Sequence, residues 1–126
     1  MAERETVVWI DHKEARVVPL GGEPTRIPAT PPDQEVHRPN KATASGRRGA
    51  HLHERYYRAV LEVLRPLGPL VLCGPSTAKF ELSAYLQRTA PDVARRVLAV
   101  ETVDHPSDRQ LAAFGRKVFA RFAEPE

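Results

Sequence analysis

The sequence predicts a single α/β domain in which a mixed β-sheet lies between two layers of helices. Three observations indicate this fold class. The 126 residues suit one domain, because two separate cores would each be too small to fold without disulfides or bound metals. Two strand-like runs joined by a short polar turn open the chain. Strand-like and amphipathic helical runs then alternate, which is typical of parallel strands connected by helices.

The first two strands are expected to form a β-hairpin. Residues 6–10 and 15–20 are rich in β-branched and aromatic side chains, and the polar residues 11–14 separate them. Pro19 and the glycines that follow end the second run, and residues 25–27 are expected to add a short edge strand. Because the hairpin is antiparallel, the complete sheet is expected to be mixed.

Residues 28–50 are expected to form one long loop. This segment has almost no large apolar residue. It contains prolines and glycines that interrupt helices and strands, namely Pro28, Pro31, Pro32, Pro39, Gly46 and Gly49. Structureless loops of this length are uncommon inside compact domains and are usually functional or disordered. We therefore expect a flexible basic loop within the domain rather than a second domain.

Apolar residues at three- and four-residue spacing predict a helix after this loop. They are Leu52, Tyr56, Val60, Val63, Leu64 and Leu67. Pro66, Gly68 and Pro69 are expected to stop the helix, and residues 70–73 then predict a short buried strand. A turn at Gly74-Pro75-Ser76 leads into a second helix with Ser76 or Thr77 as its N-cap. The apolar face of this second helix is formed by Ala78, Leu82, Tyr85 and Leu86.

The last third of the chain repeats the alternation of strand and helix. Pro91 is expected to open one further helical turn, and residues 97–103 predict another strand. Ser107 and Gln110 have the spacing of a capping box, so a last helix is expected to begin there. Its expected buried residues are Leu111, Phe114, Val118 and Phe122.

Positive charge is concentrated in one segment of the chain. The overall net charge is +3, yet six basic residues and one acidic residue lie between Arg38 and Arg58, so the rest is mildly acidic. Such a concentration suits a surface that contacts phosphates, and RNA is favoured because no DNA-recognition helix motif is present. A solvated loop without a partner explains the charges equally well. The expected RNA-contacting residues are Arg38, Lys41, Arg47, Arg48, His51, Arg55 and Arg58.

Aromatic rings near the basic segment offer a second mode of RNA contact. The ring of His51, Tyr56 or Tyr57 has the chemistry to stack on an unpaired base. The helical spacing of Tyr56 instead favours a place in the core.

Patterns for catalysis are sparse. Ser76 occupies a strand-to-helix turn but lacks the Gly-x-Ser-x-Gly pattern of a nucleophile, so capping explains it better. Asp11, Glu101 and Asp104 lie at or beyond strand ends and leave open a magnesium-dependent phosphodiesterase. Turn formation and helix capping account equally well for Asp11 and Asp104. We expect no cofactor.

Zinc binding and disulfide formation have little support in the sequence. His51 and His53 form a short histidine pair with His37 nearby, but the surrounding arginines disfavour a cation. Cys73 is the single cysteine, which excludes an intramolecular disulfide and a multi-cysteine zinc site.

No apolar run is long enough to cross a bilayer, and residues 1–5 contain no apolar signal-peptide core. We expect a cytoplasmic protein that does not contact membranes, and its oligomeric state stays open.

Four segments resemble the central domain of eukaryotic and archaeal class-1 peptide release factors and of Pelota. One is Val7-Val8-Trp9-Ile10-Asp11 in the hairpin, and another is residues 53–60, HERYYRAV, entering a helix. A third is residues 71–82, VLCGPSTAKFEL, with a Gly-Pro turn followed by Lys-x-Glu-Leu. Residues 101–108, ETVDHPSD, are especially similar to small stand-alone bacterial relatives described as translational machinery proteins. The likeness covers nearly the whole chain.

This resemblance implies a ribonuclease-H-like mixed sheet and a role on or near the ribosome. In release factors the long loop ends in Gly-Gly-Gln, which positions water for peptidyl-tRNA hydrolysis. The corresponding residues 45–51 contain neither a Gly-Gly pair nor a glutamine. Pelota also lacks this triplet and binds ribosomes, so the resemblance implies a non-catalytic protein that contacts the ribosome, rRNA or tRNA. The alternatives are a metal-dependent phosphodiesterase or nuclease and a protein-interaction module.

Overall fold

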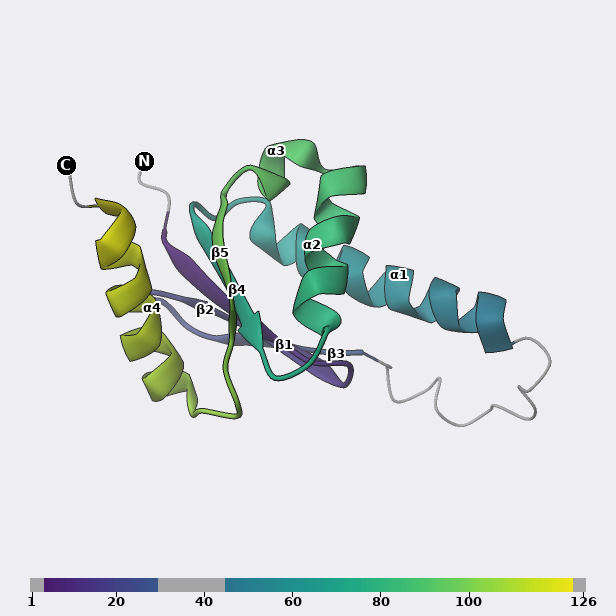
Figure 1. Cartoon of the computed structure of the whole chain (residues 1–126), viewed down its shortest axis with the longest axis horizontal. Helices are drawn as coiled ribbons and strands as arrows, with labels where there is room; N and C mark the ends of the chain where they lie inside the picture. The colour runs from purple at the N-terminus through teal and green to yellow at the C-terminus, as the bar shows by residue number, and fades with distance from the viewer. Residues whose placement is uncertain (1–3, 30–44, 124–126) are drawn as a thin grey trace.

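The computed structural model describes residues 4–29 and 45–123, without the side chains of residues 45–52. Within these ranges the strands and helices follow the expected order (Figure 1). The strands are β1 (Thr6–Ile10), β2 (Glu14–Pro19), β3 (Thr25–Pro28), β4 (Leu70–Gly74) and β5 (Val97–Thr102). The helices are α1 (Ser45–Leu64), α2 (Ala78–Thr89), α3 (Pro91–Ala94) and α4 (Asp108–Ala123).

The five strands form one mixed sheet in the order β3-β2-β1-β4-β5. Strand β2 pairs antiparallel with both β1 and β3, whereas β4 pairs parallel with both β1 and β5. Asp11 makes the hairpin turn, because its Oδ1 accepts hydrogen bonds from the backbone amides of Lys13 at 2.8 Å and Glu14 at 2.9 Å. The sheet confirms the expected α/β class with its ribonuclease-H-like arrangement.

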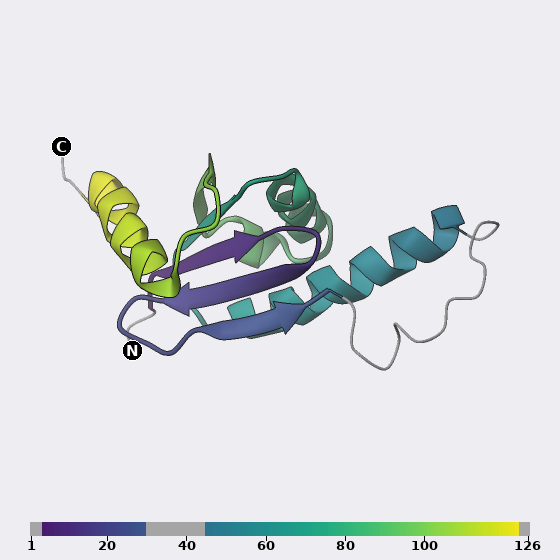
Figure 2. The same cartoon turned by 90° about the horizontal axis from the view of Figure 1, so that it is seen from below.

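Helices cover both faces of the sheet, which gives three layers (Figures 1 and 2). Helices α1, α2 and α3 pack on the face that carries Val8 and Leu72, and α4 packs on the face that carries Val7 and Val71. Successive strand residues point to opposite faces, so the central strands are buried on both sides. This explains why β1 and β4 are continuous apolar runs.

Helix α1 begins at Ser45, so the expectation of a loop reaching residue 50 is wrong at its carboxyl end. Gly46 and Gly49 signalled a loop, but each isolated glycine costs a helix only about 1 kcal/mol relative to alanine. The amphipathic helix anchored by Val60 and Leu64 therefore continues towards the amino end of the chain. Residues 30–44 of the expected loop lie outside the described residues. Figures 1 and 2 show α1 extending well past the edge of the sheet.

The turn between β4 and α2 depends on Gly74. Its φ is +149°, and a Cβ added there would lie 2.2 Å from the carbonyl oxygen of Ile10, so only glycine fits. Helix α2 follows with Thr77 as N-cap, although Thr77 makes no side-chain capping bond. The Ser76 hydroxyl instead accepts a 3.4 Å hydrogen bond from the amide of Ala78, which supports its structural role at the helix start.

The expected capping box begins α4. The Ser107 hydroxyl accepts a 3.1 Å hydrogen bond from the amide of Gln110, and the Gln110 side chain accepts one of 2.9 Å from the amide of Ser107. Gly115 allows α4 to approach β1 closely, because a Cβ added there would lie 2.3 Å from a methyl carbon of Val7. None of the helices in the described ranges combines the length and apolarity that crossing a bilayer requires.

The apolar face of α4 differs in part from the expected one. Leu111 and Val118 are buried as expected, and Phe114 is half-buried. The expectation that Phe122 is buried is wrong, because half of its surface is exposed. Phe119 is buried instead, and the three residues after it are all exposed, so the last helical turn has left the core.

Candidate nucleic-acid interface

Two of the seven expected RNA-contacting residues have described side chains. Arg55 and Arg58 both lie exposed on α1. Arg47, Arg48 and His51 belong to the same helix, but their side chains lie outside the described part of the structure. Arg38 and Lys41 lie outside the described residues altogether.

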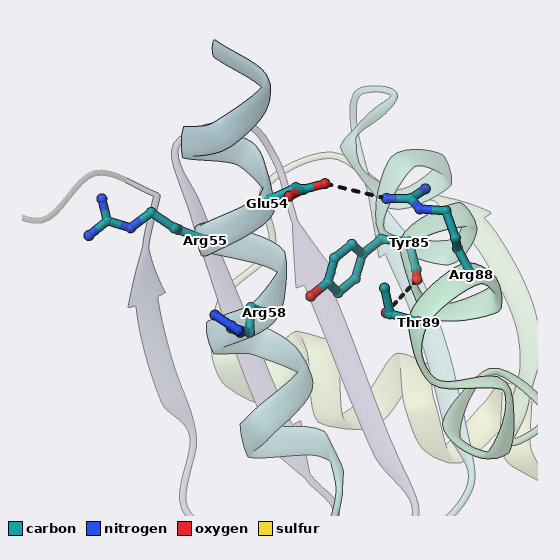
Figure 3. Close-up of a pocket in the computed structure, with 6 residues that line it drawn as sticks. All are labelled: Glu54, Arg55, Arg58, Tyr85, Arg88 and Thr89. Atoms are coloured by element: carbon teal, nitrogen blue, oxygen red, sulfur yellow. Dashed lines mark hydrogen bonds and ion pairs between the residues drawn. The ribbon is translucent and has the colours of Figure 1, made fainter. Parts of the chain in front are cut away.

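A groove of roughly 380 Å³ lies between α1 and α2 (Figure 3). Helix α1 lines it with Glu54, Arg55 and Arg58, and helix α2 lines it with Tyr85, Arg88 and Thr89. The topology brings these segments together because β4 lies beside β1, and the chain that follows β4 returns over the same face of the sheet. Both helices bury their apolar faces in one core, so their polar flanks face each other across the groove.

The groove carries more positive than negative charge. Arg88 lies 3.8 Å from the Glu54 carboxylate, but both side chains are more than half exposed, so this ion pair adds little to stability. Figure 3 shows Arg55 extending from α1 on the side away from Arg88, and Arg58 in front of the same helix. Neither is ion-paired within the described ranges. The described lining therefore has three guanidinium groups and one carboxylate, spread along a surface rather than converging on one point.

The groove continues towards a hydrogen-bonded cluster around Glu81. The Glu81 carboxylate accepts hydrogen bonds from the Tyr57 hydroxyl at 2.7 Å and the Thr77 hydroxyl at 3.2 Å, and His12 Nε2 lies 3.1 Å away. Burial alone would raise the pKa of Glu81, but the contacts with Tyr57, His12 and Thr77 outweigh it and hold that pKa below its usual value. This cluster ties the hairpin turn to α1 and α2.

The two tyrosines of α1 that the sequence offered for base stacking both lie in the core. Tyr56 and Tyr57 are both buried, and their rings stack on each other with centroids 5.2 Å apart. The Tyr56 hydroxyl donates to the carbonyl oxygen of Asp11 at 2.8 Å. Burial, followed by neighbouring acidic groups, raises the pKa of both tyrosines, so each hydroxyl keeps its proton. Tyr56 is a core residue, as its spacing predicts.

The acidic residues at the strand ends do not form the magnesium site considered above. Among the described residues, no three histidine, cysteine, aspartate or glutamate side chains are arranged to hold a metal ion. Asp11 Oδ1 accepts the two amides of the hairpin turn, and the Asp104 carboxylate lies 3.0 Å from His105 Nδ1. These contacts favour structural roles and give Glu101 no partner carboxylates for metal chemistry.

Of the histidines considered for zinc, only His53 has a described side chain. The His53 ring stacks on His12, with centroids 5.8 Å apart. The side chain of His51 and the whole of His37 lie outside the described part of the chain.

Sequence reasoning missed the α2 side of the groove. The expected core position of Tyr85 is confirmed, but no role is predicted above for Arg88 and Thr89. Arg88 and Thr89 follow Tyr85 at helical spacings of three and four residues, so a shared flank of α2 was visible in the sequence. Which part of α1 this flank faces depends on the strand order, and the sequence alone does not fix that.

Comparisons with known proteins show solved structures with a similar fold. No protein-family model matches the sequence, and no curated protein matches it. Pelota from Archaeoglobus fulgidus superposes with a TM-score of 0.50 and 16% sequence identity, over 97% of this chain and 36% of that one. An archaeal translation termination factor gives a TM-score of 0.47 and 11% identity, over 94% of this chain and 39% of that one. This chain therefore spans less than half of either protein, and the likeness to Pelota supports the α/β fold.

Proposed function

We propose that this protein is a non-catalytic, ribosome- or RNA-associated member of the translation machinery. The observation that carries the proposal is the groove between α1 and α2, where Arg55, Arg58 and Arg88 are opposed by Glu54 alone among the described lining residues. The sequence resemblance to the central domain of release factors and Pelota, together with the Pelota-like fold, supports the ribosome as the site of this RNA contact. Such a role goes with a cytoplasmic location.

The proposed contact surface includes the rest of the basic segment. Helix α1 carries Arg47, Arg48 and His51 as well as Arg55 and Arg58, and Arg38 and Lys41 precede it in the chain. A surface of several separated cations suits the successive phosphates of rRNA or tRNA better than it suits one small anion. Arg55 and Arg58 are three residues apart on a helix, which places them roughly 5–6 Å from each other at Cβ.

The affinity for RNA is expected to depend on salt through these arginines. Each phosphate contact made by a basic side chain releases counterions, with a slope of about −0.7 in log K against log salt for single strands. Replacing Arg55 and Arg58 together by alanine is therefore expected to reduce the slope by about 1.4 and to weaken binding at low salt. The assays are co-sedimentation with ribosomes and filter binding to rRNA fragments across a salt series.

A matched control removes the same charge from the opposite face of the molecule. Arg116 and Lys117 are exposed on α4, which packs on the other side of the sheet from α1. Their double replacement by alanine is expected to leave the affinity and the salt slope near those of the unmodified protein. Equal weakening by the two double variants would attribute binding to net charge alone and contradict the proposed surface. Absence of binding to ribosomes and to rRNA at low salt would overturn the proposed function.

A further inference from the structure

The hydroxyl of Tyr85 is the one tyrosine hydroxyl without a hydrogen-bond partner among the described residues. The hydroxyls of Tyr56 and Tyr57 donate to Asp11 and Glu81, respectively. The hydroxyl of Tyr85 has no such acceptor, and Figure 3 shows it pointing from α2 towards α1 within the groove. A half-enclosed hydroxyl of this kind is available both as a donor and as an acceptor to a ligand.

The ring of Tyr85 is held in place, so its position in the groove is fixed. Only 8% of the residue is exposed, and the Tyr57 ring lies against it with centroids 6.0 Å apart. The Arg88 guanidinium lies 5.6 Å from the ring centroid, and the Thr89 hydroxyl donates to the Tyr85 carbonyl at 2.7 Å. With its faces covered, Tyr85 presents to the groove a polar edge rather than a surface for stacking.

Two other groups that line the same groove suit an uncharged ligand that has both donors and acceptors. Glu54 supplies an acceptor and Arg88 a donor, and their charged atoms lie 3.8 Å apart. A bare phosphate only accepts hydrogen bonds and would be repelled by the Glu54 carboxylate. The edge of a nucleobase and the hydroxyls of ribose carry donors as well as acceptors. The groove volume of roughly 380 Å³ is that of a small ligand pocket.

We propose that the groove between α1 and α2 binds the nucleoside part of one unpaired RNA nucleotide. The Tyr85 hydroxyl, Glu54 and Arg88 contact the base edge and the ribose, while Arg55 and Arg58 contact the flanking phosphates on the outer side of α1. A paired base has its hydrogen-bonding edge occupied by its partner, so this subsite selects single-stranded RNA. The inference rests on the proposed function and adds a class of RNA to it.

Replacing Tyr85 by phenylalanine tests the subsite, because this change removes the hydroxyl and keeps the ring and the charge. The probes are fluorescently labelled single-stranded RNA, the same sequence as an RNA duplex, and inorganic polyphosphate, which has phosphates but no nucleosides. We expect the unmodified protein to prefer the single strand to the duplex. Tyr85→Phe is expected to weaken single-strand binding about 3- to 10-fold, with unchanged polyphosphate binding and salt slope.

Tyr56→Phe is the matched control for Tyr85→Phe. The Tyr56 hydroxyl is bonded inside the protein, so its loss is expected to lower the melting temperature without changing RNA affinity. The Tyr85 variant is expected to melt like the unmodified protein, because its hydroxyl has no acceptor among the described residues. This pair of variants separates a ligand contact from a loss of folding.

The outcomes separate this inference from the proposed function. Unchanged single-strand affinity in Tyr85→Phe, or equal affinity of the unmodified protein for single strand and duplex, would overturn the nucleoside subsite. The effect of Arg55→Ala with Arg58→Ala on rRNA binding would still support the proposed function in that case. Failure of all three probes to bind, together with no binding to ribosomes or rRNA at low salt, would overturn both.

Discussion

Replacing Tyr57 by phenylalanine tests the cluster that joins α1 to α2 and to the hairpin turn. The Tyr57 hydroxyl donates a 2.7 Å hydrogen bond to the Glu81 carboxylate, and Tyr57 itself is 4% exposed. A hydrogen bond to a charged group contributes about 1.5–3 kcal/mol when buried. The Glu81 side chain is 42% exposed and keeps His12 and Thr77 as neighbours, so solvent screening reduces the expected loss to about 1 kcal/mol. The melting temperature is expected to fall by about 4 °C.

The loss of stability caused by Tyr57→Phe is expected to depend on pH. The pKa of Glu81 is lower in the folded protein than in the unfolded chain, so the unfolded state binds the proton more readily. The stability from this carboxylate is therefore fully present above the ordinary glutamate pKa of about 4.3 and is lost as the pH falls through the folded value. Protonation of Glu81 leaves a weaker hydrogen bond between neutral groups, so the cost of Tyr57→Phe is expected to shrink by about half in acid.

Urea unfolding of both proteins at neutral pH and at an acidic pH below the lowered pKa of Glu81 in the folded protein measures this difference. The free energies of unfolding of the unmodified protein and of Tyr57→Phe are compared at each pH. A cost that is equal at the two pH values, or larger in acid, would refute the assignment of the stabilisation to a charged Glu81. A variant as stable as the unmodified protein at neutral pH would refute the role of the hydroxyl itself.

Three further substitutions or reactions test the body of the fold. Gly74→Ala is expected to lower the free energy of unfolding by about 3 kcal/mol or more, because Gly74 has a positive φ and lies against the Ile10 carbonyl. Chemical unfolding measures this loss, and a loss below about 1 kcal/mol would contradict the strain. Burial raises the pKa of the Cys73 thiol to about 12, so a thiol reagent at mildly alkaline pH is expected to label it only in denaturant, and rapid labelling of the native protein would contradict its burial. Arg96→Ala is expected to lower the free energy of unfolding by about 1–2 kcal/mol, because its guanidinium donates to three carbonyls at and just beyond the carboxyl end of α1. Urea unfolding measures this loss, and an effect no larger than that of the exposed Arg95→Ala would argue against this role.

Much of the fold follows from local patterns in the sequence. The capping box of Ser107 and Gln110 forms because its spacing satisfies two backbone amides at once, whatever lies around it. The start of α1 was misplaced because Gly46 and Gly49 lower helix propensity only weakly, and the rest of the helix is anchored further along. Exposure of Phe122 was missed because periodicity gives the direction of a side chain but not where the sheet beneath it ends.

The candidate site was predictable only in part. Arg55 and Arg58 stood out because they belong to a contiguous basic segment. Arg88 lies thirty positions further along the chain from Arg58 and faces α1 only because β4 pairs with β1. The open hydroxyl of Tyr85 was beyond sequence reasoning, since the difference between it and the bonded hydroxyl of Tyr57 arises from tertiary contacts.

The anchoring of α1 at one end has a mechanical consequence. Its twenty residues form a rod of about 30 Å, and its described buried residues all lie in the second half, from Tyr56 to Leu64. The eleven residues that precede Tyr56 form a lever of about 16 Å, and a tilt of about 10° at Tyr56 moves the far tip by roughly 3 Å. Small repacking around Tyr56 would thus be magnified at Ser45, while the sheet stays unchanged.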